Sequence, residues 1–145
     1  MTRCELCSDC PAPLLLVKDP PRLEAPKILA CVDPLHAHDK PAALDHQLLR
    51  SAMALAERLG GEVHALHVFS IPTPVTVVGD AYIAAAAVPP AAGTVESAAA
   101  AFRRLMADHA LPGERAHLRV GSPAREILAA ARDLDAGIVI MCAVS

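Results

Sequence analysis

The amino-acid sequence predicts an α/β fold: a three-layer sandwich in which a parallel β-sheet has helices on both faces. Short runs of consecutive apolar residues alternate along the chain with longer segments whose apolar residues recur every three or four positions. Such an alternation of buried strands and amphipathic helices is typical of parallel sheets with right-handed crossovers. Hydrophobic residues make up 54% of the 145 residues, which is enough apolar material for the core of one domain.

The first two apolar runs lie on either side of a proline-rich stretch. Leu14–Val17 and Lys27–Asp33 are short and apolar at consecutive positions, so we expect both to be buried strands. Residues 19–26 contain three prolines and are therefore expected to be a linker. This divides the chain into an N-terminal segment, residues 1–26, and a domain, residues 27–145.

A helix and a strand follow in the domain. Pro41–Leu59 is predicted to be a helix, because one face of it would be apolar. This face consists of Leu44, Leu48, Ala52, Leu55 and Leu59. Gly60-Gly61 ends the helix, and Glu62–Phe69 (EVHALHVF) is expected to be a strand. Within residues 70–93, the alanine-rich stretch Gly79–Val88 predicts either a short helix or a loop.

Two helices and two strands complete the predicted order. They are a helix capped by Thr94 and ending before Pro112, a strand Glu114–Val120, a helix running to about Asp133, and a strand Gly137–Ala143. In the second of these helices Ser122 is the expected N-cap and Pro123 the first helical residue. Ligands of such sheets bind at the carboxyl ends of the strands, where the strand order reverses.

Composition excludes several classes of protein. The net charge of −3 and the aromatic share of 2% argue against nucleic-acid binding, which needs basic surfaces or stacking aromatics. No apolar stretch approaches the roughly 20 residues of a membrane span, and the N-terminus does not resemble a signal peptide. The cysteine number is odd, with three of the five near the N-terminus, which is not a disulfide framework. We therefore expect a cytoplasmic protein that contacts neither membrane nor nucleic acid.

Four segments, taken in order, resemble the universal stress protein family: KILACVDP, LAERLGGEVHALHVF, RVGSPAREIL and DAGIVIMCAVS. The segment Cys10–Asp19 (CPAPLLLVKD) also resembles the last strand of a preceding domain of this family. The nearest architecture is thus the second domain of a tandem, E-type member. The resemblance implies a regulatory or ligand-sensing domain of the stress response, without catalytic activity. It also implies a second domain of the same family as partner, in tandem or in a homodimer.

The sequence departs from the family pattern at its C-terminal end. Members that bind ATP carry a glycine-rich stretch after the fourth strand, whose glycines let backbone amides approach the phosphates. Cys142 and Ser145 occupy the first two glycine positions, and the sequence then ends. We expect this chain to lack the last strand of the fold and to bind ATP poorly. No cofactor is assigned to it, and an adenine nucleotide such as ATP is the candidate ligand of a complete protein.

The resemblance also implies a set of ligand-binding residues. Asp33 matches the position beside the adenosine part of the ligand, and Val68 and Met141 match positions that line the adenine. Cys142 stands at the first glycine position. The alternative is that Asp33 caps a loop, while Val68 and Met141 belong to the core.

Cysteine and histidine patterns offer a third class of function, metal or redox sensing. Cys4, Cys7 and Cys10 have a C-x2-C-x2-C spacing that occurs in iron–sulfur proteins, but a fourth ligand is missing. We assign no metal site.

Other histidines give no joint site from sequence alone. His36, His38 and His46, with Asp39, either bind a metal weakly or form a solvated surface. His64 and His67 point to opposite faces of their strand.

No catalytic constellation is recognisable. Ser51 lies on a helix without a nucleophile elbow, and the adjacent Asp108 and His109 face different ways. The sequence therefore predicts a protein that is not an enzyme. The alternative is an ATP-binding switch with slow hydrolysis.

Overall fold

The computed structural model describes residues 24–35, 41, 43–70, 75–78, 81–84 and 92–142. Within them the elements are β1 (Lys27–Cys31), α2 (Ala43–Leu59), β2 (Glu62–Phe69), β3 (Val75–Val78), β4 (Ala81–Ala84), α3 (Ala92–Asp108), a 3₁₀ turn (Gly113–Arg115), β5 (Ala116–Val120), α4 (Pro123–Asp133) and β6 (Ala136–Met141). The predicted strand Leu14–Val17 lies outside the described residues, as does most of the linker.

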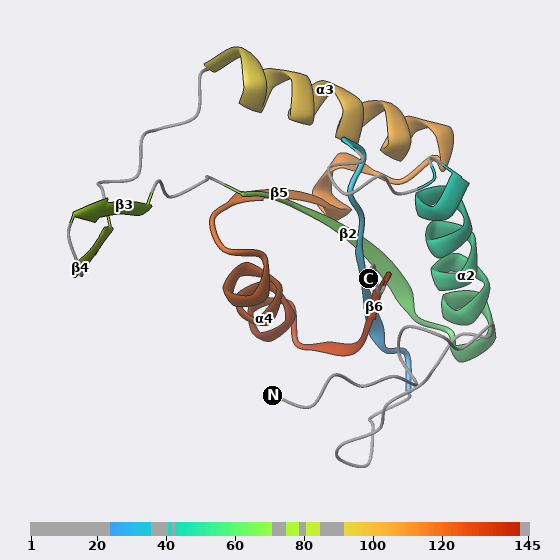
Figure 1. The fold of residues 1–145 in the computed structure, drawn as a ribbon. Coiled ribbons are helices and arrows are strands. Elements are labelled where there is room, and N and C mark those ends of the chain that lie inside the picture. The colour runs from blue at the N-terminus through green and yellow to red at the C-terminus, as the bar shows by residue number, and fades with distance from the viewer. Residues whose placement is uncertain are drawn as a thin grey trace.

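Four strands form one parallel sheet in the order β5-β2-β1-β6 (Figure 1). Every neighbouring pair is parallel, with Ile28 opposite Val63 of β2 and opposite Ile138 of β6. From β1 the chain proceeds to β2 and β5 on one side, and then returns to β6 on the other side of β1. The predicted parallel arrangement is confirmed, and the strand order reverses beside β1.

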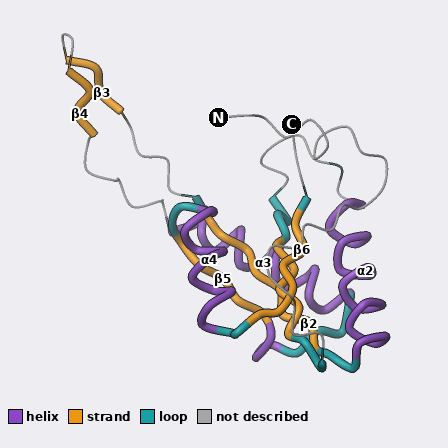
Figure 2. Tube along the Cα trace, turned by 90° about the horizontal axis from the view of Figure 1, so that it is seen from below, coloured by secondary structure: helices purple, strands orange, loops and turns teal. Residues whose placement is uncertain are grey.

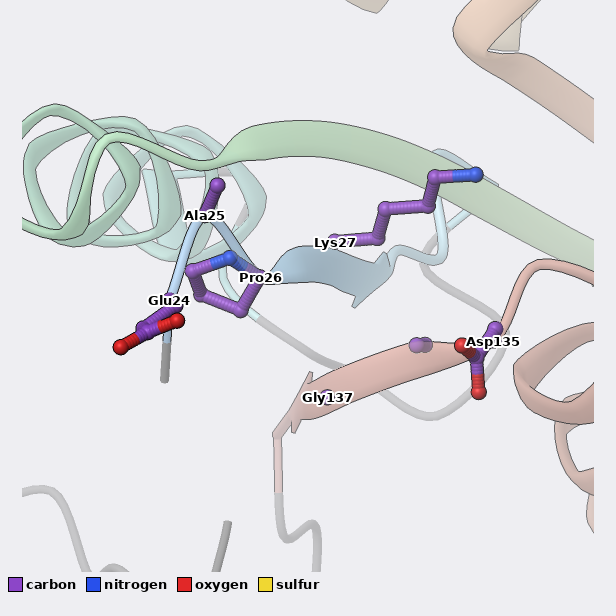
Figure 3. A pocket seen from close by; sticks show the side chains of 7 residues that line it. Glu24, Ala25, Pro26, Lys27, Asp135 and Gly137 are labelled. Atoms are coloured by element: carbon purple, nitrogen blue, oxygen red, sulfur yellow. The ribbon is translucent and has the colours of Figure 1, made fainter. Parts of the chain in front are cut away.

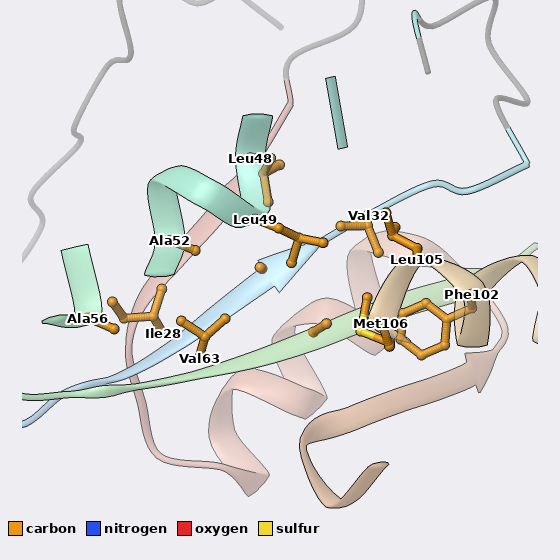
Figure 4. Close-up of a cluster of buried hydrophobic side chains, with 12 residues drawn as sticks. Ile28, Val32, Leu48, Leu49, Ala52, Ala56, Val63, Phe102, Leu105 and Met106 are labelled. Atoms are coloured by element: carbon orange, nitrogen blue, oxygen red, sulfur yellow. The ribbon is translucent and has the colours of Figure 1, made fainter. Parts of the chain in front are cut away.

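Helices cover both faces of this sheet, so the predicted three-layer sandwich is confirmed. α2 and α3 cover one face, where the larger hydrophobic cluster lies (Figure 4). This cluster consists of Ile28, Ala30, Val32, Leu48, Leu49, Ala52, Ala56, Val63, Ala65, Phe102, Leu105 and Met106. α4 covers the other face, where Ala130 packs against Leu29 and Leu66. β1 is apolar at consecutive positions because it contributes to both clusters.

The buried face of α2 differs from the predicted one. Its buried residues are Asp45, Leu48, Leu49, Ala52 and Ala56. The predicted face also included three leucines, at positions 44, 55 and 59, which are only half-buried. The small Ala52 and Ala56 bring the helix close to the sheet, and the three half-buried leucines lie along the sides of the contact.

Residues 70–93 contain a feature that the sequence analysis did not predict. β3 and β4 pair antiparallel, Val75 opposite Ala84 and Val78 opposite Ala81, and they stand apart from the four-stranded sheet in both views (Figure 2). The prediction of a helix or loop is therefore wrong for Ala81–Ala84. The β-branched run of β3 favours an extended strand, and pairing with it outweighs the helical preference of the alanines in β4.

Several element boundaries also differ from prediction: β1 ends at Cys31, α2 begins at Ala43 and β6 spans Ala136–Met141. α3 begins at Ala92, so Thr94 lies inside the helix instead of capping it. A 3₁₀ turn at Gly113–Arg115 delays the start of β5 to Ala116. None of the helices in the described part of the chain is long and apolar enough to cross a membrane.

The turn between α2 and β2 depends on glycine, as predicted. Gly60 has φ of 63°, the left-handed conformation that commonly ends helices. A Cβ on Gly61 would lie 2.2 Å from the carbonyl oxygen of Pro26. That same oxygen accepts a hydrogen bond of 3.1 Å from the backbone N–H of Glu62. The chain before β1 therefore passes directly over this turn.

Candidate functional site

A cavity of about 370 Å³ opens at the carboxyl ends of β1 and β2. Its lining comes from the end of β1, the end of β2 and the start of α4. The lining residues are Cys31, Val32, Asp33, Leu35, Leu66, His67, Val68, Phe69, Ser70, Pro123 and Ile127. Most of these side chains are apolar, and the cavity lies at the sheet edge where parallel α/β folds bind ligands.

Asp33 lies at this cavity in a loop that is anchored by α2. Its backbone N–H donates a hydrogen bond of 3.2 Å to Oδ1 of Asp45. Asp45 is 1% exposed, so a buried carboxylate from the first turn of α2 holds the residue that follows β1. This contact fixes the backbone of Asp33 at the edge of the cavity.

His67 is a polar residue of the cavity wall that the sequence analysis did not assign to the ligand site. It is 4% exposed, and its ring Nδ1 lies 3.0 Å from the carbonyl oxygen of Val32. Because a carbonyl only accepts, Nδ1 carries the proton, and Nε2 of the neutral ring is an acceptor. Among the described residues Nε2 has no hydrogen-bond partner. The ring also contacts Phe102 of α3, with centroids 6.1 Å apart.

Val68 and Cys31 form the part of the wall that α4 covers. Both pack against the cluster centred on Leu29 and Leu66. Burial raises the pKa of the Cys31 thiol to about 12. The thiol is therefore protonated at neutral pH and acts as an apolar wall group rather than as a nucleophile.

The start of α4 closes the cavity at one side. Gly121 precedes the helix with φ of 152°, and its N–H donates a hydrogen bond of 3.0 Å to the carbonyl oxygen of Phe69. Ser122 is the N-cap residue and Pro123 lies in the first turn, as predicted. The bond from Gly121 ties the start of α4 to the end of β2, which places Pro123 and Ile127 against the cavity.

The four residues predicted for ligand binding do not all meet here. Asp33 and Val68 line the same cavity. Met141 pairs in register with Cys31, which puts it on the same face of the sheet but one strand beyond the cavity, where it is 55% exposed. Cys142 points to the opposite face and packs against the cluster under α2 and α3. Ser145 lies outside the described residues.

A second cavity, of about 350 Å³, lies at the opposite end of the sheet (Figure 3). It is formed where Glu24–Lys27 runs beside Asp135–Gly137, before β1 and at the start of β6. The exposed Glu24 and Asp135 put two carboxylates at this end. Because it shares no lining residue with the first cavity, substitutions in this second cavity serve as controls for substitutions in the first.

Of the histidines that the structure describes, those outside the first cavity form two pairs. His46 of α2 contacts His109, with Nδ1 and Nε2 2.8 Å apart. His64 of β2 contacts His117 of β5, with Nδ1 and Nε2 3.1 Å apart. His64 and His67 lie on opposite faces of β2, as predicted. His64 contacts His117 of β5, whereas His67 contacts Phe102 of α3.

The described residues include no group of three or more His, Cys, Asp or Glu side chains placed to hold a metal ion. His36, His38 and Asp39 lie outside the described part of the chain, as do Cys4, Cys7 and Cys10. The predictions that concern them are therefore not tested by the structure.

Sequence reasoning missed Asp45 and His67 as residues of the site. Asp45 was detectable as an acidic residue adjoining the apolar face of the predicted helix. His67 was detectable as a histidine in an otherwise apolar run, one residue before Val68. Both signals were present, but only the packed structure shows which polar residues of apolar elements are buried.

The fold and the cavity together define a class: parallel α/β domains with a cavity at the carboxyl edge of the sheet. The sequence model of the "Universal stress protein family" matches residues 24–144. The chain therefore belongs to the universal stress protein family.

Two solved structures from Pseudomonas aeruginosa are similar to this chain. One is a putative universal stress protein from strain UCBPP-PA14, with 20% sequence identity and a TM-score of 0.61. The other is a functionally unknown protein from strain PAO1, with 19% identity and a TM-score of 0.60. In each comparison the match covers 81% of this chain and 36% of the other chain, so this chain spans about a third of the length of these proteins. At these identities the likeness shows the fold alone. No curated protein matches the sequence.

Proposed function

We propose that this chain is a stress-response domain that senses a small ligand and performs no catalysis itself. Membership of the universal stress protein family supports a role in the stress response. The observation that carries the ligand-sensing part is the cavity of about 370 Å³ at the carboxyl ends of β1 and β2. Its position and its mainly apolar wall are those expected of a small-molecule site.

The chemistry of the wall favours a ligand such as adenosine. Val68 and Ile127 offer apolar contact to a flat heterocycle, and the Asp33 carboxylate can accept hydrogen bonds from ribose hydroxyls. A triphosphate needs backbone amides or a helix N-terminus facing its oxygens, with glycines where the backbone must come close. Cys142 stands at the first of the family's glycine positions with a partly buried side chain packed against the core, which argues against tight ATP binding.

Calorimetric titration with adenosine, AMP and ATP tests this proposal. We expect adenosine to bind with a dissociation constant in the millimolar to high-micromolar range, about 4–6 kcal/mol of binding free energy, and ATP to bind no more tightly. Asp33→Ala should weaken adenosine binding at least tenfold. Asp135→Asn, in the second cavity at the other end of the sheet, is the matched control and should leave binding unchanged. Failure of all three ligands to bind would refute the proposal and favour Asp33 as a loop cap.

Slow ATP hydrolysis by a nucleotide switch is the alternative within the same cavity. The protonated thiol of Cys31 bears only on covalent catalysis, because it supplies no thiolate nucleophile at this wall. Tight ATP binding that Asp33→Ala abolishes, together with release of phosphate, would favour the switch instead.

A second universal-stress domain is the partner that we propose, either in tandem or in a homodimer. β6 is an edge strand of the described sheet, and its Val139 and Met141 are 38% and 55% exposed. Open apolar edges recruit other strands. Sedimentation should show association that Val139→Lys weakens. A monodisperse monomer at high concentration would contradict this.

Metal or redox sensing through Cys4, Cys7 and Cys10 is the proposal of a different class. Metal analysis of anaerobically purified protein distinguishes it, since a bound cluster would be lost when these cysteines are replaced by serine.

A further inference from the structure

A chain of polar side chains joins β2 to β5 on the face of the sheet that α4 covers. Glu62, His64 and Leu66 alternate onto this face, where Leu66 packs against α4. His117 is the register partner of Leu66 and therefore points to the same face. The contact between His64 and His117 joins residues 53 positions apart, so it depends on the sheet register and is not visible in the local sequence.

Glu62 determines how the protons are arranged in this chain. Its Oε1 lies 3.1 Å from His64 Nε2, and a carboxylate only accepts hydrogen bonds. His64 Nε2 therefore carries a proton, and in the neutral ring Nδ1 presents its lone pair to His117 Nε2 at 3.1 Å. Arg115 lies 3.3 Å from the other oxygen of Glu62 and holds the carboxylate in place.

Two imidazoles that face each other in this way, with a carboxylate behind one of them, match the groups around a transition-metal ion. A metal-bound histidine commonly donates its second N–H to a carboxylate, which fixes the ring and raises its basicity. Nitrogen ligands lie about 2.0–2.1 Å from zinc, so two of them in tetrahedral geometry are about 3.3 Å apart. The 3.1 Å between His64 Nδ1 and His117 Nε2 is close to that separation.

We propose that His64 Nδ1 and His117 Nε2 bind a borderline divalent cation such as Zn²⁺, with Glu62 as the carboxylate that orients His64. The proton of the hydrogen bond then moves to Nδ1 of His117, so that both facing nitrogens offer lone pairs. Water completes the coordination, because no third protein ligand adjoins the pair among the described residues. The site is therefore exchangeable, unlike a closed structural zinc site. Arg115 and Arg119 are nearby cations that lower its affinity.

The second histidine pair lacks these features and provides the matched control. His46 Nδ1 and His109 Nε2 are 2.8 Å apart, which suits a hydrogen bond but is short for two ligands of one metal ion. Among the described residues, no carboxylate is hydrogen-bonded to either of these two rings. We expect this pair to keep its hydrogen bond when Zn²⁺ is added.

Titration of the full chain with Zn²⁺, read by ring-resolved NMR of ¹⁵N-labelled histidines, tests the proposal. We expect His64 Nδ1 and His117 Nε2 to shift together, while the rings of His46 and His109 stay unchanged. Ring resolution separates this site from zinc held by cysteines or by other histidines. If Zn²⁺ binds elsewhere, or the resonances of His64 and His117 do not move, the proposal is wrong.

Variants separate the ligands from the orienting carboxylate. His117→Gln should abolish the shift at His64 Nδ1, whereas His109→Gln should leave it intact. Glu62→Gln keeps an acceptor oxygen but loses the charge, and we expect the zinc affinity of the pair to fall about 10–100-fold, as for other outer-shell partners. An unchanged affinity in a folded Glu62→Gln protein would show that the carboxylate has no part in the site. Circular dichroism confirms that each variant is folded.

Discussion

Replacing Asp45 by alanine removes the buried carboxylate that holds the loop after β1. Oδ1 of Asp45 accepts the hydrogen bond from the backbone N–H of Asp33, at 3.2 Å, and the side chain is almost fully buried. A hydrogen bond to a charged group contributes about 1.5–3 kcal/mol, and its loss here also deprives the Asp33 N–H of this acceptor. We expect Asp45→Ala to lower the free energy of unfolding by about 2 kcal/mol, which corresponds to a fall in Tm of roughly 4–8 °C.

Urea unfolding followed by circular dichroism measures this change, since the chain has no tryptophan for fluorescence. Asp45→Asn keeps an oxygen that can accept the bond and should cost less than about 1 kcal/mol. Glu57→Ala, on the exposed side of the same helix, is the control for general effects on α2. If Asp45→Ala is no less stable than Glu57→Ala, Asp45 does not anchor the Asp33 loop and our account of the cavity is wrong at that point.

Three further predictions concern the turn before β2, the cavity thiol and acid stability. Gly61→Ala should destabilise the protein by about 1–3 kcal/mol in urea unfolding, because its Cβ would overlap the Pro26 carbonyl. Gly113→Ala is the control: a Cβ there has open space, so stability should change by less than about 0.5 kcal/mol. Cys31 should resist alkylation at pH 8 in peptide mass mapping, since a pKa of about 12 leaves a thiolate population roughly a thousandfold below that of an ordinary thiol; rapid labelling would contradict this. Burial lowers the pKa of His109, so the unfolded chain binds a proton at this residue more readily than the folded protein does. The free energy of unfolding should therefore fall as pH drops below about 6.5. If His109→Gln leaves the pH dependence of the free energy of unfolding unchanged, His109 is not the cause.

The layered fold was predictable because its strands and helices have unambiguous apolar patterns. β2 was predicted with its observed ends, Glu62 and Phe69, since two glycines precede it and Ser70 follows the last apolar position. The hairpin β3–β4 was missed because its alanines favour helix locally, whereas its strands are stabilised by pairing with each other. The local sequence pattern predicted the elements whose conformation is determined by burial in the core. It did not predict strands whose conformation depends on pairing with a neighbouring strand.

The candidate site was predictable only in part. Asp33 and Val68 line one cavity because both lie at the carboxyl ends of neighbouring strands, and their role in ligand binding stays a prediction. Met141 and Cys142 are adjacent in sequence but point to opposite faces, and Met141 lies one strand further out. The pairing of His64 with His117 depends on the register between β2 and β5, which no local pattern encodes.

The position of β1 at the centre of the sheet constrains the order in which the domain can fold during synthesis. β2 follows β1 after a single helix, so one side of β1 can be paired early. Its other side pairs with β6, the last strand of the described chain, and stays open until that strand has left the ribosome. Until then an almost wholly apolar strand presents an unpaired edge, which is a hazard for aggregation. Pairing on this side of β1 therefore waits until residues 136–141 have been synthesised, so the four-stranded sheet cannot form from its first two strands alone.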